Sequence, residues 1–117
     1  MVKAVTDDKI ISIILKAAED KQATNPIVLN LRDKNSVFDY LVVMSGESNP
    51  QLKAIIESIE YKVKQAGRKG KVFEGSLDSG WLVLDLSNIV VHVMSDEERA
   101  FYNIEGLWQK DAVITYN

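Results

Sequence analysis

Two apolar segments in the second half of the chain, residues 81–86 (WLVLDL) and 89–94 (IVVHVM), are separated by only residues 87–88 (SN). A connection of two residues suits the tight turn of an antiparallel hairpin, whereas parallel strands need a crossover of about a dozen residues or more. The turn lacks the preferred Asn-Gly or Asp-Gly pair, but its length sets the register. We therefore expect a hairpin in which Trp81 faces Met94.

The two faces of this hairpin differ in composition. In the expected register, one face carries only aliphatic side chains, namely Leu82, Leu84, Leu86, Ile89, Val91 and Val93. We expect these side chains to pack against helices, because burial of aliphatic surface is the main favourable term in folding. The other face carries Trp81, Val83, Asp85, Val90, His92 and Met94.

This second face is too apolar for ordinary solvent-exposed surface and too polar for a closed core. Such a mixture is typical of a docking face, in which Trp81 would anchor a partner and Asp85 would attract a basic group. The alternative is that the C-terminal helix covers the indole. For His92 a packing or hydrogen-bonding role is favoured over catalysis, because no nucleophile pattern lies nearby.

The remaining elements surround the hairpin. Apolar residues at helical spacing predict helices over 6–21 and 49–67, the second with Asn49 as N-cap and Gly67 at its end. Runs of β-branched and aromatic residues predict strands at 27–31, 38–44 and 71–74, and the Ser45-Gly46 pair should end the second of them.

A capping-box pattern, Ser95 with Glu98, predicts a last helix that carries Tyr102, Leu107 and Trp108. The predicted fold class is α/β (α+β): a single small domain with a mixed β-sheet packed by helices.

Composition excludes several classes of function. The chain has 117 residues, no Cys and one His, so it can build neither thiolate nor imidazole metal clusters, and no cofactor is expected. No apolar run approaches the ~18 residues of a membrane span, so we expect a soluble, cytoplasmic protein. The net charge of −3 argues against wrapping of nucleic acid by the whole surface.

Two other functions remain open. A basic run at Lys62, Lys64, Arg68, Lys69 and Lys71 could contact RNA phosphate, although no stacking motif accompanies it. An enzyme of nucleotidyltransferase type would use Ser45 and Ser48 with the carboxylates of Asp39, Glu74 and Asp85 to bind a magnesium nucleotide. No carboxylate pair has the spacing of a two-metal site on one strand face.

Three sequence blocks resemble the Iojap family, also called ribosomal silencing factors. The first block is Asp39–Val43 with Ser45, Gly46 and Ser48, and the second is Glu74-Gly75 followed by Trp81–Asp85. The third is Val90–Met94 with Arg99, Tyr102, Glu105, Leu107 and Trp108. The resemblance spans about residues 6 to 108, which we take as domain 1–108 with a tail 109–117. Asn30 stands where the family usually has an acid.

The resemblance implies a fold similar to nucleotidyltransferases without their catalytic carboxylates, and a translational repressor rather than an enzyme. Such a repressor binds the large ribosomal subunit through its protein number fourteen and sterically prevents the small subunit from joining. A minor contact with ribosomal RNA is open, and the free protein could form a homodimer.

Combined with the docking face, the resemblance predicts which side chains contact the ribosomal protein. Trp81 would be the anchor, and Asp85 and Glu74 would accept hydrogen bonds from Lys or Arg. The remaining expected contacts are Val83, His92, Met94, Tyr40 and Tyr102.

Overall fold

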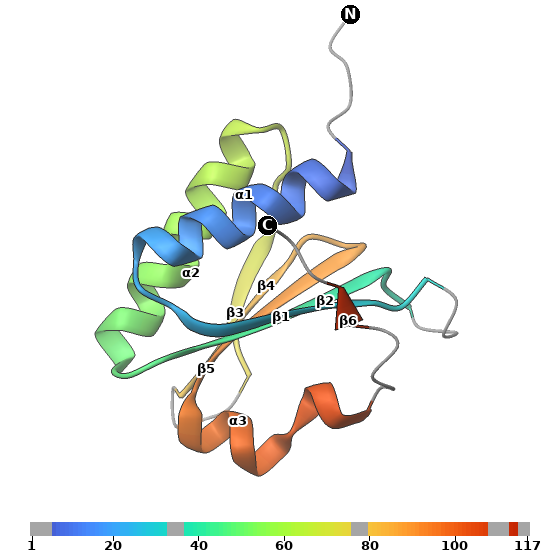
Figure 1. The fold of residues 1–117 in the computed structure, drawn as a ribbon. Coiled ribbons are helices and arrows are strands. Elements are labelled where there is room, and N and C mark those ends of the chain that lie inside the picture. The colour runs from blue at the N-terminus through green and yellow to red at the C-terminus, as the bar shows by residue number, and fades with distance from the viewer. Residues whose placement is uncertain (1–5, 33–36, 76–79, 108–112, 115–117) are drawn as a thin grey trace, which may run out of the picture.

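The computed structural model of the chain describes residues 6–32, 37–75, 80–107 and 113–114. Its strands form one six-stranded sheet in the order β3-β4-β5-β2-β1-β6 (Figure 1). The elements in chain order are α1 (Asp7–Asp20), β1 (Thr24–Asn30), β2 (Tyr40–Gly46), α2 (Asn49–Gln65), β3 (Lys71–Glu74), β4 (Trp81–Asp85), β5 (Ile89–Ser95), α3 (Asp96–Tyr102), the 3₁₀ helix η1 (Ile104–Leu107) and β6 (Val113–Ile114).

The sheet is mixed, as predicted. Strands β2 and β5 are parallel, and the other pairs of neighbouring strands are antiparallel. In the predicted hairpin Trp81 pairs with Met94 and Asp85 pairs with Val90, which confirms the register. The predicted fold class, a small single-domain α+β protein, is therefore correct.

Helices α1 and α2 lie together on one face of the sheet, and α3 lies on the other (Figure 1). The main core forms under α1 and α2, and we call this side the helix-covered face. The aliphatic face of the hairpin belongs to it, through Leu84, Leu86, Ile89, Val91 and Val93, with Leu82 partly buried. The opposite side is called the α3 face below. None of the helices that the structure describes is both long and apolar enough to cross a membrane.

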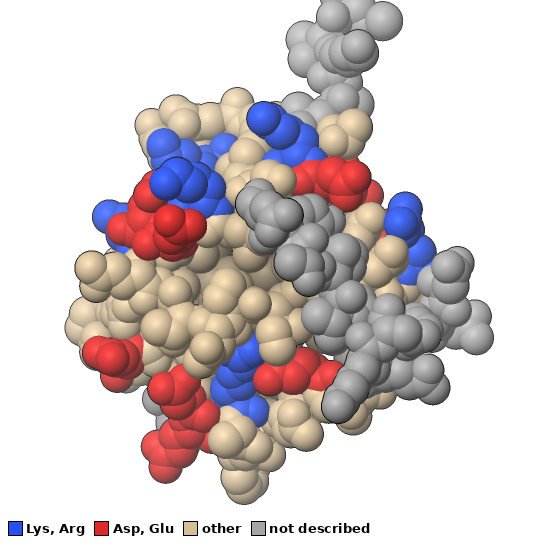
Figure 2. All heavy atoms as spheres, viewed as in Figure 1, with Lys and Arg blue, Asp and Glu red and all other residues tan. Residues whose placement is uncertain are grey.

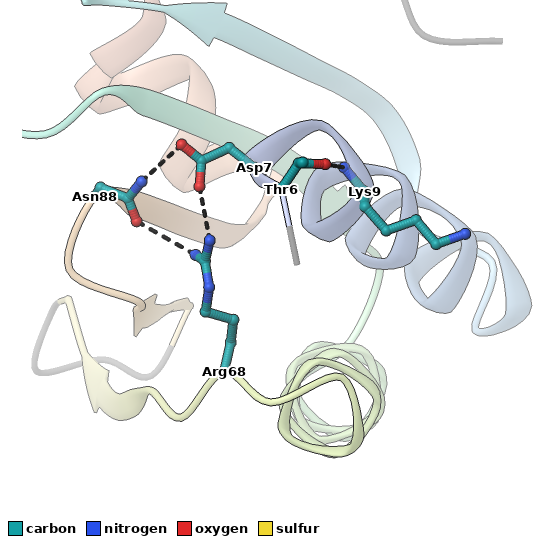
Figure 3. A network of polar contacts seen from close by, with 5 residues as sticks. All are labelled: Thr6, Asp7, Lys9, Arg68 and Asn88. Atoms are coloured by element: carbon teal, nitrogen blue, oxygen red, sulfur yellow. Dashed lines mark hydrogen bonds and ion pairs between the residues drawn. The ribbon is translucent and has the colours of Figure 1, made fainter. Parts of the chain in front are cut away.

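The start of α1 is fixed by its own cap and by a polar network (Figure 3). Thr6 Oγ1 accepts a hydrogen bond from the N–H of Lys9, which makes Thr6 the N-cap. Asp7 accepts hydrogen bonds at 2.9 Å from Arg68 Nη2, just after α2, and from Asn88 Nδ2 in the β4–β5 turn. The hydrogen bond from Arg68 lowers the pKa of the Asp7 carboxyl. Segments far apart in sequence are thereby joined at one end of the hairpin.

Strands β1 and β2 differ from the predicted ranges. Strand β1 begins at Thr24, before Pro26, because Thr24 pairs with Ser45 and a bulge between Thr24 and Ile27 accommodates the proline. Strand β2 does not end at Ser45, because its parallel pairing with β5 continues to Gly46 opposite Ser95. Both faces of β2 are buried, as its apolar run predicts.

Helix α2 begins one residue earlier than predicted. Its N-cap is Ser48, whose Oγ accepts a hydrogen bond from the N–H of Gln51, so Asn49 is the first helical residue. The helix ends as predicted before Gly67, which adopts a φ of 95° that only glycine adopts readily.

The last helix is shorter than predicted. Ser95 is its N-cap and accepts a hydrogen bond from the N–H of Glu98, but α3 ends at Tyr102 because Asn103 adopts a left-handed conformation with a φ of 43°. Leu107 therefore lies in η1, and Trp108 lies outside the described residues. Within the tail, β6 pairs with the edge of β1.

Candidate functional site

The α3 face of the sheet is only partly closed by α3 and η1. A second, smaller core forms there from Leu29, Leu31, Leu41, Val43 and Met94, with Ile27, Phe38, Trp81 and Ile104 partly buried around it. Met94 and Val83 are buried, so their predicted exposure is wrong. Met94 is buried because α3 contacts β5 and β2 and because Ile104 of η1 packs against this second core, and Val83 lies on β4 between β3 and β5.

Aromatic side chains gather at the border of this cover. The Trp81 ring lies 5.7 Å from the His92 ring and 4.9 Å from the Tyr102 ring, and Phe101 contacts Tyr102 edge to face at 4.9 Å. Phe73 pairs with Val83 on β4, which places it on the same face. We call Phe73, Trp81, His92, Phe101 and Tyr102 the aromatic cluster.

The outer members of the aromatic cluster are exposed to solvent. Phe101 is 79% exposed, Phe73 47% and Tyr102 46%, while Trp81 and His92 are half-buried beneath them. Trp81 is partly buried: it packs against the second core and contacts Tyr102 of α3, so α3 covers the indole in part and leaves some of it exposed. Exposed aromatic side chains around a half-buried tryptophan are typical of a protein-binding surface.

Trp81 is held in place by a hydrogen bond to His92. The indole Nε1 donates to His92 Nδ1 at 2.8 Å, so the imidazole is neutral with its proton on Nε2. Burial lowers the pKa of His92 from 6.5 to about 4 and keeps this form at neutral pH. The predicted hydrogen-bonding role of His92 is confirmed.

A glycine next to β3 makes room for the indole. A Cβ atom added at Gly75 would lie 2.5 Å from Cδ2 of Trp81. Any other residue at this position would push the indole away from β3. The N–H of Gly75 also donates to the carbonyl of Trp81 at 2.8 Å, which continues the β3–β4 pairing.

A buried arginine fixes α3 to the sheet. Arg99 Nε donates to both carboxylate oxygens of Glu105 at 3.0 and 3.2 Å, and its Nη1 donates to Ser45 Oγ at 2.9 Å. These contacts join α3, η1 and β2 in one network. Because Phe101 and Tyr102 lie on α3, Arg99 determines where the outer half of the aromatic cluster lies.

Acidic side chains lie on two of the elements that carry the aromatic cluster. Asp96 and Glu97 are exposed in the first turn of α3, and Asp85 is exposed on β4. Figure 2 shows acidic side chains gathered at its lower left, over the start of α3 as Figure 1 places it. One oxygen of Asp85 accepts a hydrogen bond from the N–H of Ser87, so this side chain also stabilises the turn. The first turn of α3 is thus anionic, whereas Asp85 lies opposite the exposed Lys71 in the β3–β4 pairing.

Two predicted contact residues lie on the other side of the sheet. Tyr40 pairs with Ile89 and is buried in the main core, where burial raises its pKa. Glu74 pairs with Leu82, so its side chain also points to the helix-covered face. Their placement beside Trp81 was wrong because side chains alternate between the faces of a strand, and the register of their strands was not known.

The arrangement that the enzyme alternative requires is not found among the described residues. Ser45 is buried against Arg99, and Ser48 caps α2. Glu74 and Asp85 point to opposite faces of the sheet. No group of three or more His, Asp or Glu side chains in the described part of the chain could hold a metal ion.

The arginine of the basic run takes part in the fold. Arg68 binds Asp7 and Asn88 (Figure 3) and serves the fold. The lysines of the run, Lys62, Lys64, Lys69 and Lys71, are exposed.

Sequence reasoning missed four residues of this site: Phe73, Phe101, Gly75 and Arg99. Arg99 and Gly75 stood in the blocks that carry the family resemblance, but neither had an assigned role. The sequence signal for Phe101 was an aromatic pair, Phe101-Tyr102, on the expected last helix. The position of Phe73 on the α3 face follows from the β3–β4 register, which the sequence alone does not determine.

Comparisons with known proteins agree with one another. A family model described as "Ribosomal silencing factor during starvation" matches residues 4–117. The chain is 34% identical over 99 residues to the ribosomal silencing factor of Bacillus subtilis, covering 85% of this chain and 84% of that protein. A crystal structure of a Chromobacterium violaceum protein is similar with a TM-score of 0.83 and 32% identity, covering 96% of this chain and 95% of that one. A mouse protein named "Mitochondrial assembly of ribosomal large subunit protein 1" is 26% identical, covering 84% of this chain and 44% of its own length.

Proposed function

Because this chain belongs to the ribosomal silencing factor family, we propose that its aromatic cluster binds the large ribosomal subunit. Family membership supports a ribosome-associated regulator of translation. The finer proposal is that the partner on the subunit is its protein number fourteen. The bound domain would then occupy the face that the small subunit approaches and prevent the two subunits from joining.

The observation that carries this proposal is the exposure of Phe101, Tyr102 and Phe73 around a half-buried Trp81. Binding energy at protein interfaces concentrates in such aromatic side chains, because they bury a large area at a small cost in side-chain entropy. The Trp81–His92 hydrogen bond and the Arg99 network hold the cluster before the partner arrives. A surface ordered in advance loses less entropy on binding.

Charge supports a basic partner. The chain carries a net charge of −3, and exposed Asp96 and Glu97 lie in the first turn of α3, the helix that carries Phe101 and Tyr102. Opposite charge on a ribosomal protein would speed the encounter, while apolar burial would supply the affinity. The same exposed aromatic side chains would favour a homodimer of the free protein when no subunit is present.

The first experiment compares two exposed aromatic residues on opposite sides of the molecule. Phe101 is 79% exposed on α3, and Tyr61 is 59% exposed on α2, so replacing either one should leave the fold intact. We expect Phe101→Ala to weaken binding to isolated large subunits by roughly tenfold or more, because a truncated interface aromatic typically costs over 1.4 kcal/mol. Tyr61→Ala should bind like the unmodified protein. Co-sedimentation with purified large subunits measures both.

The second readout is subunit joining. Added to a mixture of both subunits, the unmodified protein should reduce the amount of joined ribosomes, and Phe101→Ala should need roughly tenfold more protein for the same effect. Light scattering or gradient sedimentation follows this reaction. If Phe101→Ala binds and inhibits as well as Tyr61→Ala does, the aromatic cluster is not the binding surface.

A further inference from the structure

Strand β3 is the outermost strand of the sheet that the structure describes. It stands first in the strand order, next to β4 alone, and all four of its residues, Lys71–Glu74, are exposed. Among the described residues, no strand pairs with this outer edge. An open edge presents a row of backbone donors and acceptors to which another strand can be added.

The register determines which backbone groups point outward. The N–H of Gly75 donates to the carbonyl of Trp81, opposite it in the β3–β4 pairing. Inward and outward peptide groups alternate along an antiparallel strand, so the N–H and C=O groups of Val72 and Glu74 point away from β4. A strand added at this edge would form its hydrogen bonds with these two residues.

Beside this edge, on the helix-covered face, lies a groove of about 440 Å³ between α2 and β3. Apolar residues lining it are Ile56, Val72 and Leu82, and Phe73, between Val72 and Glu74 on β3, also borders it. Carboxylates from both elements also line it, namely Glu57 and Glu60 of α2 and Glu74 of β3, against a single cation, Lys53. The groove exists because α2 packs over β4, β5 and β2 rather than over β3.

The edge and the groove combine into one binding site. The outward peptide groups and the groove-lining side chains belong to the same residues, Val72 and Glu74. Residues paired directly across a sheet place their side chains on the same face. Every second side chain of an added strand would therefore point into the groove, toward Glu57, Glu60 and Glu74.

We propose that this site binds an extended segment of a partner protein that carries lysine or arginine at alternate positions. Backbone pairing with Val72 and Glu74 would hold the segment, and the carboxylates of the groove would select its charge. The same carboxylates would repel nucleic acid phosphate and acidic segments. The groove lies on the helix-covered face, whereas Trp81, Phe101 and Tyr102 lie on the α3 face, so the proposal does not depend on the function proposed above.

The test uses a probe peptide and the full chain. The probe is the pentapeptide Lys-Val-Lys-Val-Lys with blocked ends, whose lysines all project to one side when it is extended. Amide NMR spectra of the isotope-labelled protein should show shifts that concentrate at Val72, Glu74 and the groove side of α2. The amides of Val72 and Glu74 should exchange more slowly with solvent when the peptide is bound, because they become hydrogen-bonded.

Two control peptides separate backbone pairing from charge. A version of the probe with N-methyl groups on the lysine amides cannot pair with the edge and should not protect Val72 and Glu74. The peptide Glu-Val-Glu-Val-Glu should not bind, because its carboxylates would face those of the groove. If either control peptide binds as tightly as the probe, the proposal is overturned.

Matched variants test the groove itself. Glu57→Lys combined with Glu60→Lys should weaken probe binding roughly fivefold to tenfold, since each reversed charge removes an attraction and adds a repulsion. The control combines Glu19→Lys with Asp20→Lys, a pair of exposed acids on α1 outside the groove, and should change binding less than about twofold. An equal effect of both pairs would show attraction by net charge and refute a site at β3. The groove variant should still bind large subunits. A result that refutes peptide binding at the groove is therefore distinct from one that refutes subunit binding by the aromatic cluster.

Discussion

The two faces of the sheet are covered by very different amounts of helix. Two helices of 14 and 17 residues, α1 and α2, close the helix-covered face, and most of the fully buried isoleucines lie there. The α3 face is covered by a helix of seven residues and one 3₁₀ turn. The first face buries enough apolar surface to hold the domain together, and the second leaves aromatic side chains for a partner.

This difference shows how a small domain separates stability from recognition. Strands β5 and β2 contribute to both faces, because alternate side chains point to opposite sides. Val91 therefore packs under the helices, while its neighbour His92 holds Trp81 on the α3 face. Substitutions on one face should change mainly the free energy of unfolding, and substitutions on the other should change mainly binding.

The largest effect is expected from the helix-covered face. Ile59 of α2 is completely buried in the main core, so Ile59→Ala should lower the free energy of unfolding by about 3 kcal/mol through lost burial and a cavity. Denaturant titration measures this loss. At a temperature where the variant is still folded, its affinity for large subunits should equal that of the unmodified protein. A large loss of affinity in the folded variant would show that the helix-covered face also contributes to subunit binding.

The next substitution should change both the free energy of unfolding and subunit binding. Arg99→Met leaves Glu105 and Ser45 without their partner and should lower the free energy of unfolding by about 2 kcal/mol or more. It should also weaken subunit binding, because α3 carries Phe101 and Tyr102.

The matched control for Arg99 is an exposed ion pair. Lys16 and Asp20 lie 3.2 Å apart on α1 with both side chains largely exposed, so Lys16→Met should cost less than about 0.5 kcal/mol. Thermal unfolding and subunit binding are measured on both variants. Equal losses in the two variants would contradict an anchoring role for Arg99.

The free energy of unfolding should also depend on pH through His92 on the α3 face. The pKa of His92 is about 4 in the folded chain and 6.5 when unperturbed, so between these values the unfolded chain takes up a proton that the folded chain does not. The contribution of His92 to the free energy of unfolding is fully present above pH 6.5. As the pH falls toward 4, the free energy of unfolding decreases by about 3 kcal/mol at most. Denaturant titrations at several pH values between 7 and 4 measure the free energy of unfolding. This free energy should fall more steeply with decreasing pH in the unmodified protein than in His92→Gln. Identical pH profiles would show that His92 is not buried as described.

The smallest effect is expected from the basic run. Lys64 and Lys69 are exposed and belong to the segment around the end of α2. If ribosomal RNA contributes only a minor contact, Lys64→Gln combined with Lys69→Gln should weaken subunit binding by less than about threefold and lower its salt dependence slightly. Binding measured at two salt concentrations checks this. A loss as large as that of Phe101→Ala would move the main contact from the aromatic cluster to RNA.

The hairpin was predictable from the sequence because its register depends on the length of a single turn. The positions of Tyr40 and Glu74 were not, because each depends on pairing with a strand far away in the sequence. Met94 was expected to be exposed from the hairpin alone, and its burial follows from packing of α3 and β2. Phe73 and Phe101 join Trp81 only through these same long-range contacts.

The proposed function depends most on contact between the aromatic cluster and the large subunit. Its most direct test is photocrosslinking to purified large subunits, with a photoreactive benzoyl analogue in place of Phe101 in one protein and in place of Tyr61 in the other. Both positions are exposed, and they lie on opposite sides of the sheet. We expect position 101 to crosslink to ribosomal protein number fourteen and position 61 not to. A crosslink to that protein from position 61, with none from position 101, would contradict the proposed function.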